Sequence, residues 1–168
     1  MTNAELQLAG YFAKCEPAMA KLGKALRAKL RARLPGLFEI VYMYENQNAL
    51  VISYSPTERG YEGVCSLSVY PHVVKLGFGR GAELAKSDPK KLLKGTGKTV
   101  RYIELQTAAA FDRPEIEALI AAAVKLAKLR LDPDGEGAMI VKAEEQKQRA
   151  RRTTKSARPA PRRKAPGL

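Results

Sequence analysis

The stretch from residue 37 to residue 55 has the sequence LFEIVYMYENQNALVISYS, in which two strand-like runs flank the polar tetrapeptide ENQN at 45–48. Both runs, 37–45 and 49–55, are rich in β-branched and aromatic residues, which favour strands, and so short a connection joins antiparallel neighbours. Further strand-like segments follow at 64–71, 73–79 and 99–105, with a tight turn at Pro71-His72. We therefore expect an antiparallel sheet of about five strands.

Helical patterns lie on either side of these strands. Residues 2–5, with the sequence TNAE, form a capping box that predicts a helix to about Lys14. Pro17 suits the first turn of a second helix, which we expect to end near Leu34, and the sequence DRPE at 112–115 predicts the start of a third. Amphipathic helices around a run of strands predict an α+β fold, a two-layer sandwich with the helices on one face of the sheet.

Alternation along the strands assigns each side chain to one of the two faces of the sheet. We expect the helices to cover Phe38, Ile40, Tyr42, Tyr44, Leu50, Ile52, Tyr54, Cys65, Leu67, Val69, Val74, Leu76, Phe78, Ile103 and Leu105. We expect the opposite, open face to show Val41, Met43, Val51, Ser53, Ser66, Ser68, Tyr70, Lys75 and Tyr102. An exposed face this apolar is usually covered, and we expect a twofold homodimer to bury it.

The net charge of +13 is concentrated at one end of the 168-residue chain. Residues 142–168 contain ten Lys and Arg against two Glu, and they have three prolines and no aromatic residue. Such a segment cannot bury enough apolar surface to offset its ordering entropy. We predict a folded domain at 1–141 and a disordered basic tail at 142–168, which binds nucleic acid or another polyanion through Arg149, Arg151, Arg152, Lys155, Arg158, Arg162, Arg163 and Lys164.

We expect neither a signal peptide nor a membrane span. The first residues lack the basic and apolar pattern of a signal, and the longest apolar run, 118–124, is too short to cross a bilayer. Cys15 and Cys65 are 50 positions apart without metal-ligand spacing, so we interpret them as small buried residues of a cytoplasmic protein. The sequence names no metal site and does not identify a cofactor.

The sequence GKT at 97–99 is typical of the end of a phosphate-binding loop, but the glycine that such a loop needs at position 92 is a leucine. A strand-like segment also follows it where that motif requires a helix, so we exclude a phosphate-binding loop.

Arg101 is the strongest single candidate for ligand binding. It alternates with Ile103 and Leu105, and on that buried side its guanidinium needs a carboxylate, a carbonyl or a ligand anion as partner. A structural ion pair would satisfy Arg101 as well as a ligand would, and Lys98 is either part of an anion site or a solvated lysine in a glycine turn. The candidate ligand-binding residues are Arg101, Lys98, Lys75 and Tyr42.

Many positions between about Phe12 and Ala127 resemble the YdhG-like bacterial domains, a family of unknown function. The resemblance rests on Leu26-Arg27, Leu30, Leu34-Pro35, Glu39-Ile40-Val41-Tyr42, Val74-Lys75-Leu76-Gly77-Phe78, Gly81, Leu84, Asp88-Pro89, Leu92-Leu93, Gly95, Gly97-Lys98 and Arg101. It implies a small α/β domain, and some members of the family are likened to frataxin, which delivers iron.

An iron carrier is the third and least favoured hypothesis. The charge of the first long helix argues against it. Frataxin-type binding relies on an acidic ridge of oxygen ligands, whereas this helix presents Lys21, Lys24, Arg27, Lys29, Arg31 and Arg33. This basic face is interpreted as a solvated surface, with polyanion contact as the alternative. The acidic cluster of Asp112, Glu115 and Glu117 is interpreted as helix-capping and helix-dipole residues.

We therefore expect a non-catalytic cytoplasmic binding module whose basic tail attracts polyanions without sequence preference. The alternative is an enzyme or a domain that binds a small anionic ligand in a pocket near Arg101. His72 is interpreted as a surface turn residue. Five tyrosines in or next to the strands either line a pocket, stack on bases or are ordinary strand residues: Tyr42, Tyr44, Tyr54, Tyr70 and Tyr102. No RNP-like motif supports an RNA-reading sheet.

Overall fold

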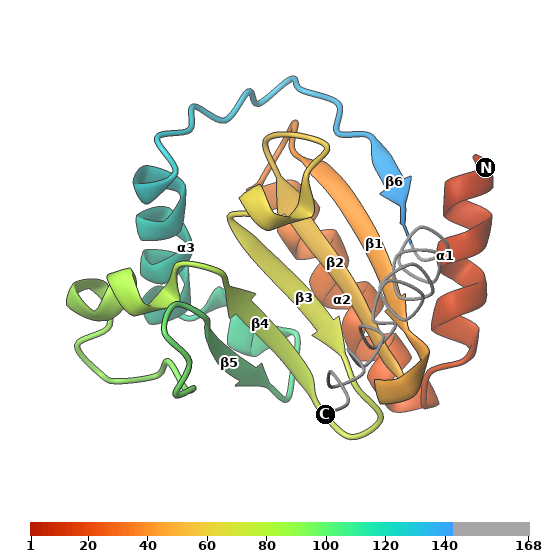
Figure 1. The fold of residues 1–168 in the computed structure, drawn as a ribbon, viewed down its shortest axis with the longest axis horizontal. Helices are drawn as coiled ribbons and strands as arrows, with labels where there is room; N and C mark the ends of the chain where they lie inside the picture. Colours follow the sequence, from red (N-terminus) through yellow and green to blue (C-terminus); the bar gives the residue numbers. More distant parts are fainter. Residues whose placement is uncertain (143–168) are drawn as a thin grey trace, which may run out of the picture.

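The computed structural model describes residues 1–142, which form a six-stranded sheet with helices packed on one of its faces (Figure 1). The order across the sheet is β5-β4-β3-β2-β1-β6. The two-layer α+β sandwich expected from the sequence is confirmed. The strands are β1 (Phe38–Tyr44), β2 (Ala49–Ser55), β3 (Cys65–Val69), β4 (Val74–Phe78), β5 (Arg101–Leu105) and β6 (Met139–Val141).

The α-helices α1 (Asn3–Ala13), α2 (Pro17–Arg33) and α3 (Pro114–Leu126) begin close to where the sequence predicts. The Thr2 hydroxyl accepts a hydrogen bond from the Glu5 amide at 3.2 Å, and α2 and α3 both have a proline in the first turn, where its missing N–H is harmless. The expected capping role of Asp112 is wrong. This residue ends the 3-10 turn η4 (Ala109–Asp112), and Arg113 occupies the N-cap position without a side-chain bond.

The core lies between the helices and the covered face of the sheet. Leu26 and Leu30 of α2 are fully buried, and with Leu119 of α3 they belong to one cluster with Ile52 and Leu67 of the sheet. Burying one such side chain contributes about 1.5–3 kcal/mol. This apolar layer covers one face of the sheet.

The strands β1 to β5 follow one another as antiparallel neighbours. Asn48 ends the first connection in the left-handed conformation, with φ 47°, which an asparagine tolerates better than most residues. The turn pairs Tyr44 with Ala49 and thereby Tyr42 with Val51. A connection of four residues thus determines which face every side chain of β1 occupies.

The expected faces of β1 are wrong, while those of β2 to β5 agree with the structure. Glu39 pairs with Tyr54 and Val41 with Ile52, so Glu39, Val41 and Met43 face the helices. Both sets of β1 side chains are apolar enough to be buried, and the glutamate is tolerated because Arg27 of α2 binds it. The residues of β1 on the open face are Phe38, Ile40, Tyr42 and Tyr44.

The strand β6 was not expected from the sequence, and it pairs parallel to β1 at the edge of the sheet. The chain after α3 crosses one end of the sheet to reach it (Figure 1). Glycines permit this crossing, because a Cβ on Gly137 would lie 2.0 Å from the Leu37 carbonyl oxygen and a Cβ on Gly135 2.9 Å from the Gly36 Cα. The ladder continues to Lys142, whose amide donates to the Val41 carbonyl at 2.9 Å, one residue past the expected end of the domain.

The predicted basic tail, with its eight proposed nucleic-acid contacts, lies outside the described residues except for Lys142. In the described range, 1–142, none of the helices combines the length and the apolar character needed to span a bilayer.

Candidate functional site

The connection between β2 and β3, residues 56–64, folds back over the open face of the sheet and forms one wall of a groove of about 660 Å³. The Ser53 hydroxyl donates to the Gly60 carbonyl at 3.0 Å, and the Ser55 hydroxyl donates to the Arg59 carbonyl at 2.8 Å. These bonds fix the 3-10 turn η2 (Gly60–Glu62) to β2. Two serines on the open face of one strand therefore position the groove wall.

Two glycines let this connection lie against the sheet. A Cβ on Gly60 would lie 1.9 Å from the Tyr42 hydroxyl oxygen, and a Cβ on Gly63 would lie 2.3 Å from the Ser53 hydroxyl oxygen. Either contact is far shorter than packed atoms allow. Any other residue at these positions would push the groove wall away from the sheet.

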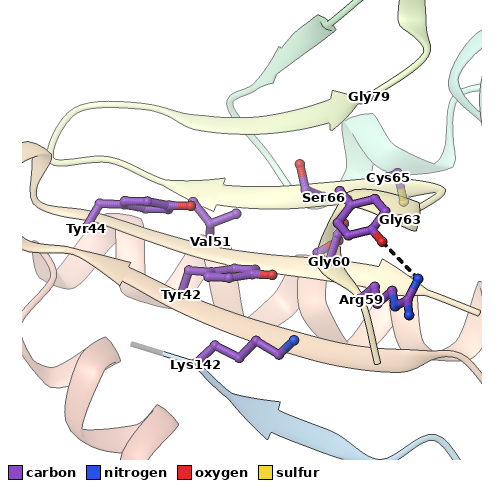
Figure 2. A pocket seen from close by; sticks show the side chains of 12 residues that line it. Tyr42, Tyr44, Val51, Arg59, Gly60, Gly63, Cys65, Ser66, Gly79 and Lys142 are labelled. Atoms are coloured by element: carbon purple, nitrogen blue, oxygen red, sulfur yellow. Dashed lines mark hydrogen bonds between the residues drawn. The ribbon is translucent and has the colours of Figure 1, made fainter. Parts of the chain in front are cut away.

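The tyrosines of β1 line one end of the groove (Figure 2). Tyr42 and Tyr44 are two positions apart on one strand and so share a face, and their rings are stacked with centroids 6.1 Å apart and planes inclined by 20°. Val51 and Ser66 continue the lining across β2 and β3. The groove thus combines flat aromatic surface with hydroxyl groups.

Arg59 and Lys142 supply positive charge to the groove, and no Asp or Glu is present among the described residues that line it. The Arg59 guanidinium donates to the Tyr61 hydroxyl at 3.1 Å, and the Lys142 ammonium donates to the Glu58 carbonyl at 2.7 Å. Figure 2 shows the Lys142 side chain extending beside Tyr42 toward the Arg59 end of the groove. An arrangement of this kind is complementary to an anion that carries a planar group.

Cys65 is among the residues beside the groove, but its side chain faces the helix layer, so its thiol is not presented to a ligand there. Complete burial raises its pKa to about 12, so the thiol stays protonated.

A second aromatic cluster lies on the open face, toward the β5 edge of the sheet. The Lys75 ammonium lies 4.9 Å from the ring centroid of Tyr70 and 4.3 Å from that of Tyr102. Both distances are typical of cation–π interactions. Strand pairing connects this cluster to the groove, because a single row across the sheet runs through Tyr42, Val51, Ser68 and Lys75.

The structure separates the four residues of the expected ligand site. Arg101 lies on the helix side of β5, as alternation predicts, and its guanidinium donates to the carbonyls of Gly97 and Val100. A cavity of about 340 Å³ lies beside it and is lined by Lys91, but not by the exposed Lys98. Lys75 and Tyr42 lie on the opposite face of the sheet. The expected set is therefore not one site.

Ion pairs within the domain neutralise much of the basic face of α2. Arg27 donates to both carboxylate oxygens of Glu39 at 2.8 Å and to Glu5 at 3.1 Å. Other cations of this face connect α2 to the region of α3: Lys29 to Asp112 at 2.6 Å, and Arg33 to Glu117 at 2.8 Å. Lys21 and Lys24 stay exposed, so only part of the face keeps its positive charge.

Glu39 is held by three side chains from two elements, α2 and β2, and both of its carboxylate oxygens are bound. Besides Arg27, the Tyr54 hydroxyl donates to it at 3.1 Å and the Arg31 guanidinium lies 3.4 Å away. Burial would lower the pKa of Arg27, but the hydrogen bonds and the charge of Glu39 outweigh burial and raise it. Burial, together with the charge of Glu39, raises the pKa of Tyr54 well above its ordinary value. We interpret this network as a structural lock between the layers.

The three acids of the expected acidic cluster bind three different cations. Asp112 binds Lys29, Glu117 binds Arg33, and Glu115 binds Lys90. Across residues 1–142, His, Cys, Asp and Glu side chains do not gather in threes where they could hold a metal ion. His72 is exposed in the turn between β3 and β4, as expected.

Sequence reasoning missed Arg59, Tyr61 and Lys142 as residues of the groove. The signal that could have found the first two is the connection 56–64, which is longer than a hairpin turn and contains two glycines. No local signal marks Lys142, because its place depends on the pairing of β6 with β1.

Comparison of the chain with protein-family models, curated proteins and solved structures found no match in any of the three. The resemblance to YdhG-like domains stays a prediction from the sequence motifs.

Proposed function

We propose that the protein is a non-catalytic binding module that associates with nucleic acid or another polyanion through its basic segment, residues 143–168, and the groove at which that segment begins. One observation carries the proposal: Lys142 lines the groove, and the 26 residues that follow it in the sequence contain nine Lys and Arg. A polyanion bound by this segment is therefore held beside a second, cationic surface.

The chemistry of the groove favours binding over catalysis. None of the described residues that line it is a His, Asp or Glu, and its charged side chains are the cations Arg59 and Lys142. The Cys65 thiol faces the helix layer and has a raised pKa. The buried carboxylate of Glu39 lies on the other face, and both of its oxygens are bound by Arg27. We also propose the cytoplasm as the compartment, because Cys15 and Cys65 are free thiols.

Salt dependence of binding tests this function. If six to eight charges of the chain engage duplex phosphates, log K against log salt falls with a slope of about −5 to −7. Fluorescence anisotropy with a labelled duplex and with heparin measures it. We expect the chain without residues 143–168 to fold, because residues 1–142 already contain the six-stranded sheet and a buried core cluster, and to lose most of this binding.

A full-length chain with Gln at the nine Lys and Arg of residues 143–168 is the matched control, since it keeps the length and loses the charge. Binding that is insensitive to salt, or equal binding by the shortened chain, contradicts the proposal.

A small anionic ligand near Arg101 is the second candidate, and the cavity lined by Arg101 and Lys91 favours it. Because Arg101 already binds two carbonyls of its own loop, we expect Arg101→Met to lower the melting temperature and Lys98→Ala to leave it unchanged. Melting curves of both variants with phosphorylated metabolites make the test. A stable Arg101→Met protein that loses one ligand would favour the pocket instead.

A homodimer that covers the open face is also a proposal. Its expected patch is partly wrong, because Val41 and Met43 face the helices, while Val51, Tyr70 and Tyr102 do lie on the open face. Light scattering at micromolar concentrations measures the mass in solution.

A further inference from the structure

We propose that the open face of the sheet is a track for single-stranded nucleic acid, on which bases stack at both aromatic clusters, so that the protein binds single strands more tightly than duplexes. This inference rests on the proposed polyanion function and names the class of ligand. Its basis is the row of side chains that connects the groove to the cluster around Lys75.

The two ends of the row have the same chemistry. At one end Tyr42 and Tyr44 stack in the groove that the cations Arg59 and Lys142 also line, and at the other Tyr70 and Tyr102 flank Lys75. Aromatic rings next to cations are the pairing that binds single strands without sequence preference, because every base has a stacking face and every nucleotide a phosphate.

The distance between the ends fits an extended ligand. Tyr42 and Lys75 are separated by three strand spacings, and neighbouring strands lie about 4.8 Å apart, so their backbones are about 14 Å apart. A ligand with a single planar ring does not stack on both clusters at once, whereas a strand of several nucleotides does.

The side chains between the clusters are small and uncharged. Val51 and Ser68 lie between Tyr42 and Lys75. In the adjacent row Ser66 is partly exposed, while Ser53 is buried beneath the connection 56–64. Glu104 faces Lys75 across the strand pair at the far end, but Lys94 lies 3.4 Å from its carboxylate and offsets its charge. A phosphate chain therefore crosses the sheet without meeting an unpaired acid among the described residues of these rows.

A duplex cannot use this surface. The bases of a duplex are stacked on one another inside the helix, so only its phosphates and sugars can contact the tyrosines. Stacking therefore separates the two ligand classes, while the basic segment attracts both.

The test compares ligands that differ only in their bases. The probes are a labelled oligothymidylate about twenty nucleotides long, its abasic counterpart with the same phosphates, and a duplex of equal length. At one fixed salt concentration we expect the full-length chain to bind the thymidylate at least about fivefold more tightly than the abasic strand.

Tyrosine variants locate the effect. We expect Tyr42→Ala and Tyr102→Ala each to reduce the ratio of thymidylate to abasic affinity, and Tyr42→Phe and Tyr102→Phe to keep it, since stacking needs the ring and not the hydroxyl. Tyr11→Ala, on α1 in the helix layer, is the matched control and should keep the ratio. Because each ratio is measured within one variant, loss of folded protein lowers both affinities and leaves the ratio unchanged.

Equal binding of the thymidylate and abasic strands by the full-length chain would overturn the inference and leave the polyanion function standing. Tighter binding of the duplex, or alanine variants that keep the ratio, would also overturn it. Failure to bind any of the three probes would contradict the polyanion function itself.

Discussion

Charged side chains lie on both faces of the sheet, but their partners differ. On the helix face, Arg27 binds Glu39 and Glu5, so its charge is neutralised inside the domain. On the open face, Lys142 binds a carbonyl, Arg59 binds a hydroxyl and lies 3.9 Å from the Glu62 carboxylate, and Lys75 lies between two rings. The same residue types therefore form close ion pairs within the fold on one face and have mostly uncharged partners on the other.

The largest effect should come from breaking the lock on the helix face. Glu39→Gln leaves the guanidinium of Arg27 half-buried without its main counter-charge, and we expect a loss of about 3 kcal/mol in the free energy of unfolding, measured by urea denaturation. Glu83→Gln, which breaks an exposed pair with Arg80, is the control and should change stability little. Similar effects of both changes would contradict the distinction between the faces.

A smaller effect is expected from the groove wall. Gly60→Ala places a Cβ against the Tyr42 hydroxyl, and moving the wall should cost about 1–3 kcal/mol of stability and weaken binding of single strands. Gly10→Ala in α1 is the control, because a Cβ there has no neighbour within 4 Å.

The double variant Gly60→Ala with Tyr42→Phe sharpens this test, because removing the hydroxyl oxygen removes the closest clash. We expect it to be more stable than Gly60→Ala alone. If the losses of stability of the two single variants simply add in the double variant, the contact between residue 60 and the Tyr42 hydroxyl does not position the groove wall.

The smallest effect concerns Cys65 and the pH. Its pKa is raised from 9.0 to about 12 in the folded protein, so above pH 9 the unfolded chain releases the thiol proton while the folded chain keeps it. Stability therefore falls as the pH rises through that range, by roughly 1 kcal/mol at about pH 10. Denaturation curves at about pH 8 and about pH 10 should show a smaller difference for Cys65→Ala than for Cys15→Ala. An unchanged difference in Cys65→Ala would contradict this assignment.

Most helices and strands could be predicted from the sequence, because the residues that start or end them act within a few positions. Thr2 caps α1, and the prolines at 17 and 114 start α2 and α3. The polar sequence at 45–48 forms the expected turn. The same local reasoning failed at Asp112, where the chain makes a 3-10 turn before the helix begins.

The candidate site could not be predicted as a whole, because its residues come together from distant parts of the chain. Tyr42 was a candidate, but on the wrong face, and Lys75 was on the correct face without a known neighbour. Arg59 reaches the groove through a long connection, and Lys142 reaches it through β6, which pairs with a strand about a hundred positions earlier.

The sequence by itself determined the α+β class, the positions of the helices and most strands, and the concentration of positive charge in residues 142–168. Only the tertiary structure decided the faces of β1. Phe38, Ile40, Tyr42 and Tyr44, which share one face, are as apolar as Val41 and Met43 on the other. The choice depends on the register with β2 and on Arg27, which makes Glu39 tolerable beneath the helix layer. Local alternation contains no information about either contact, because both are made with other elements of the fold.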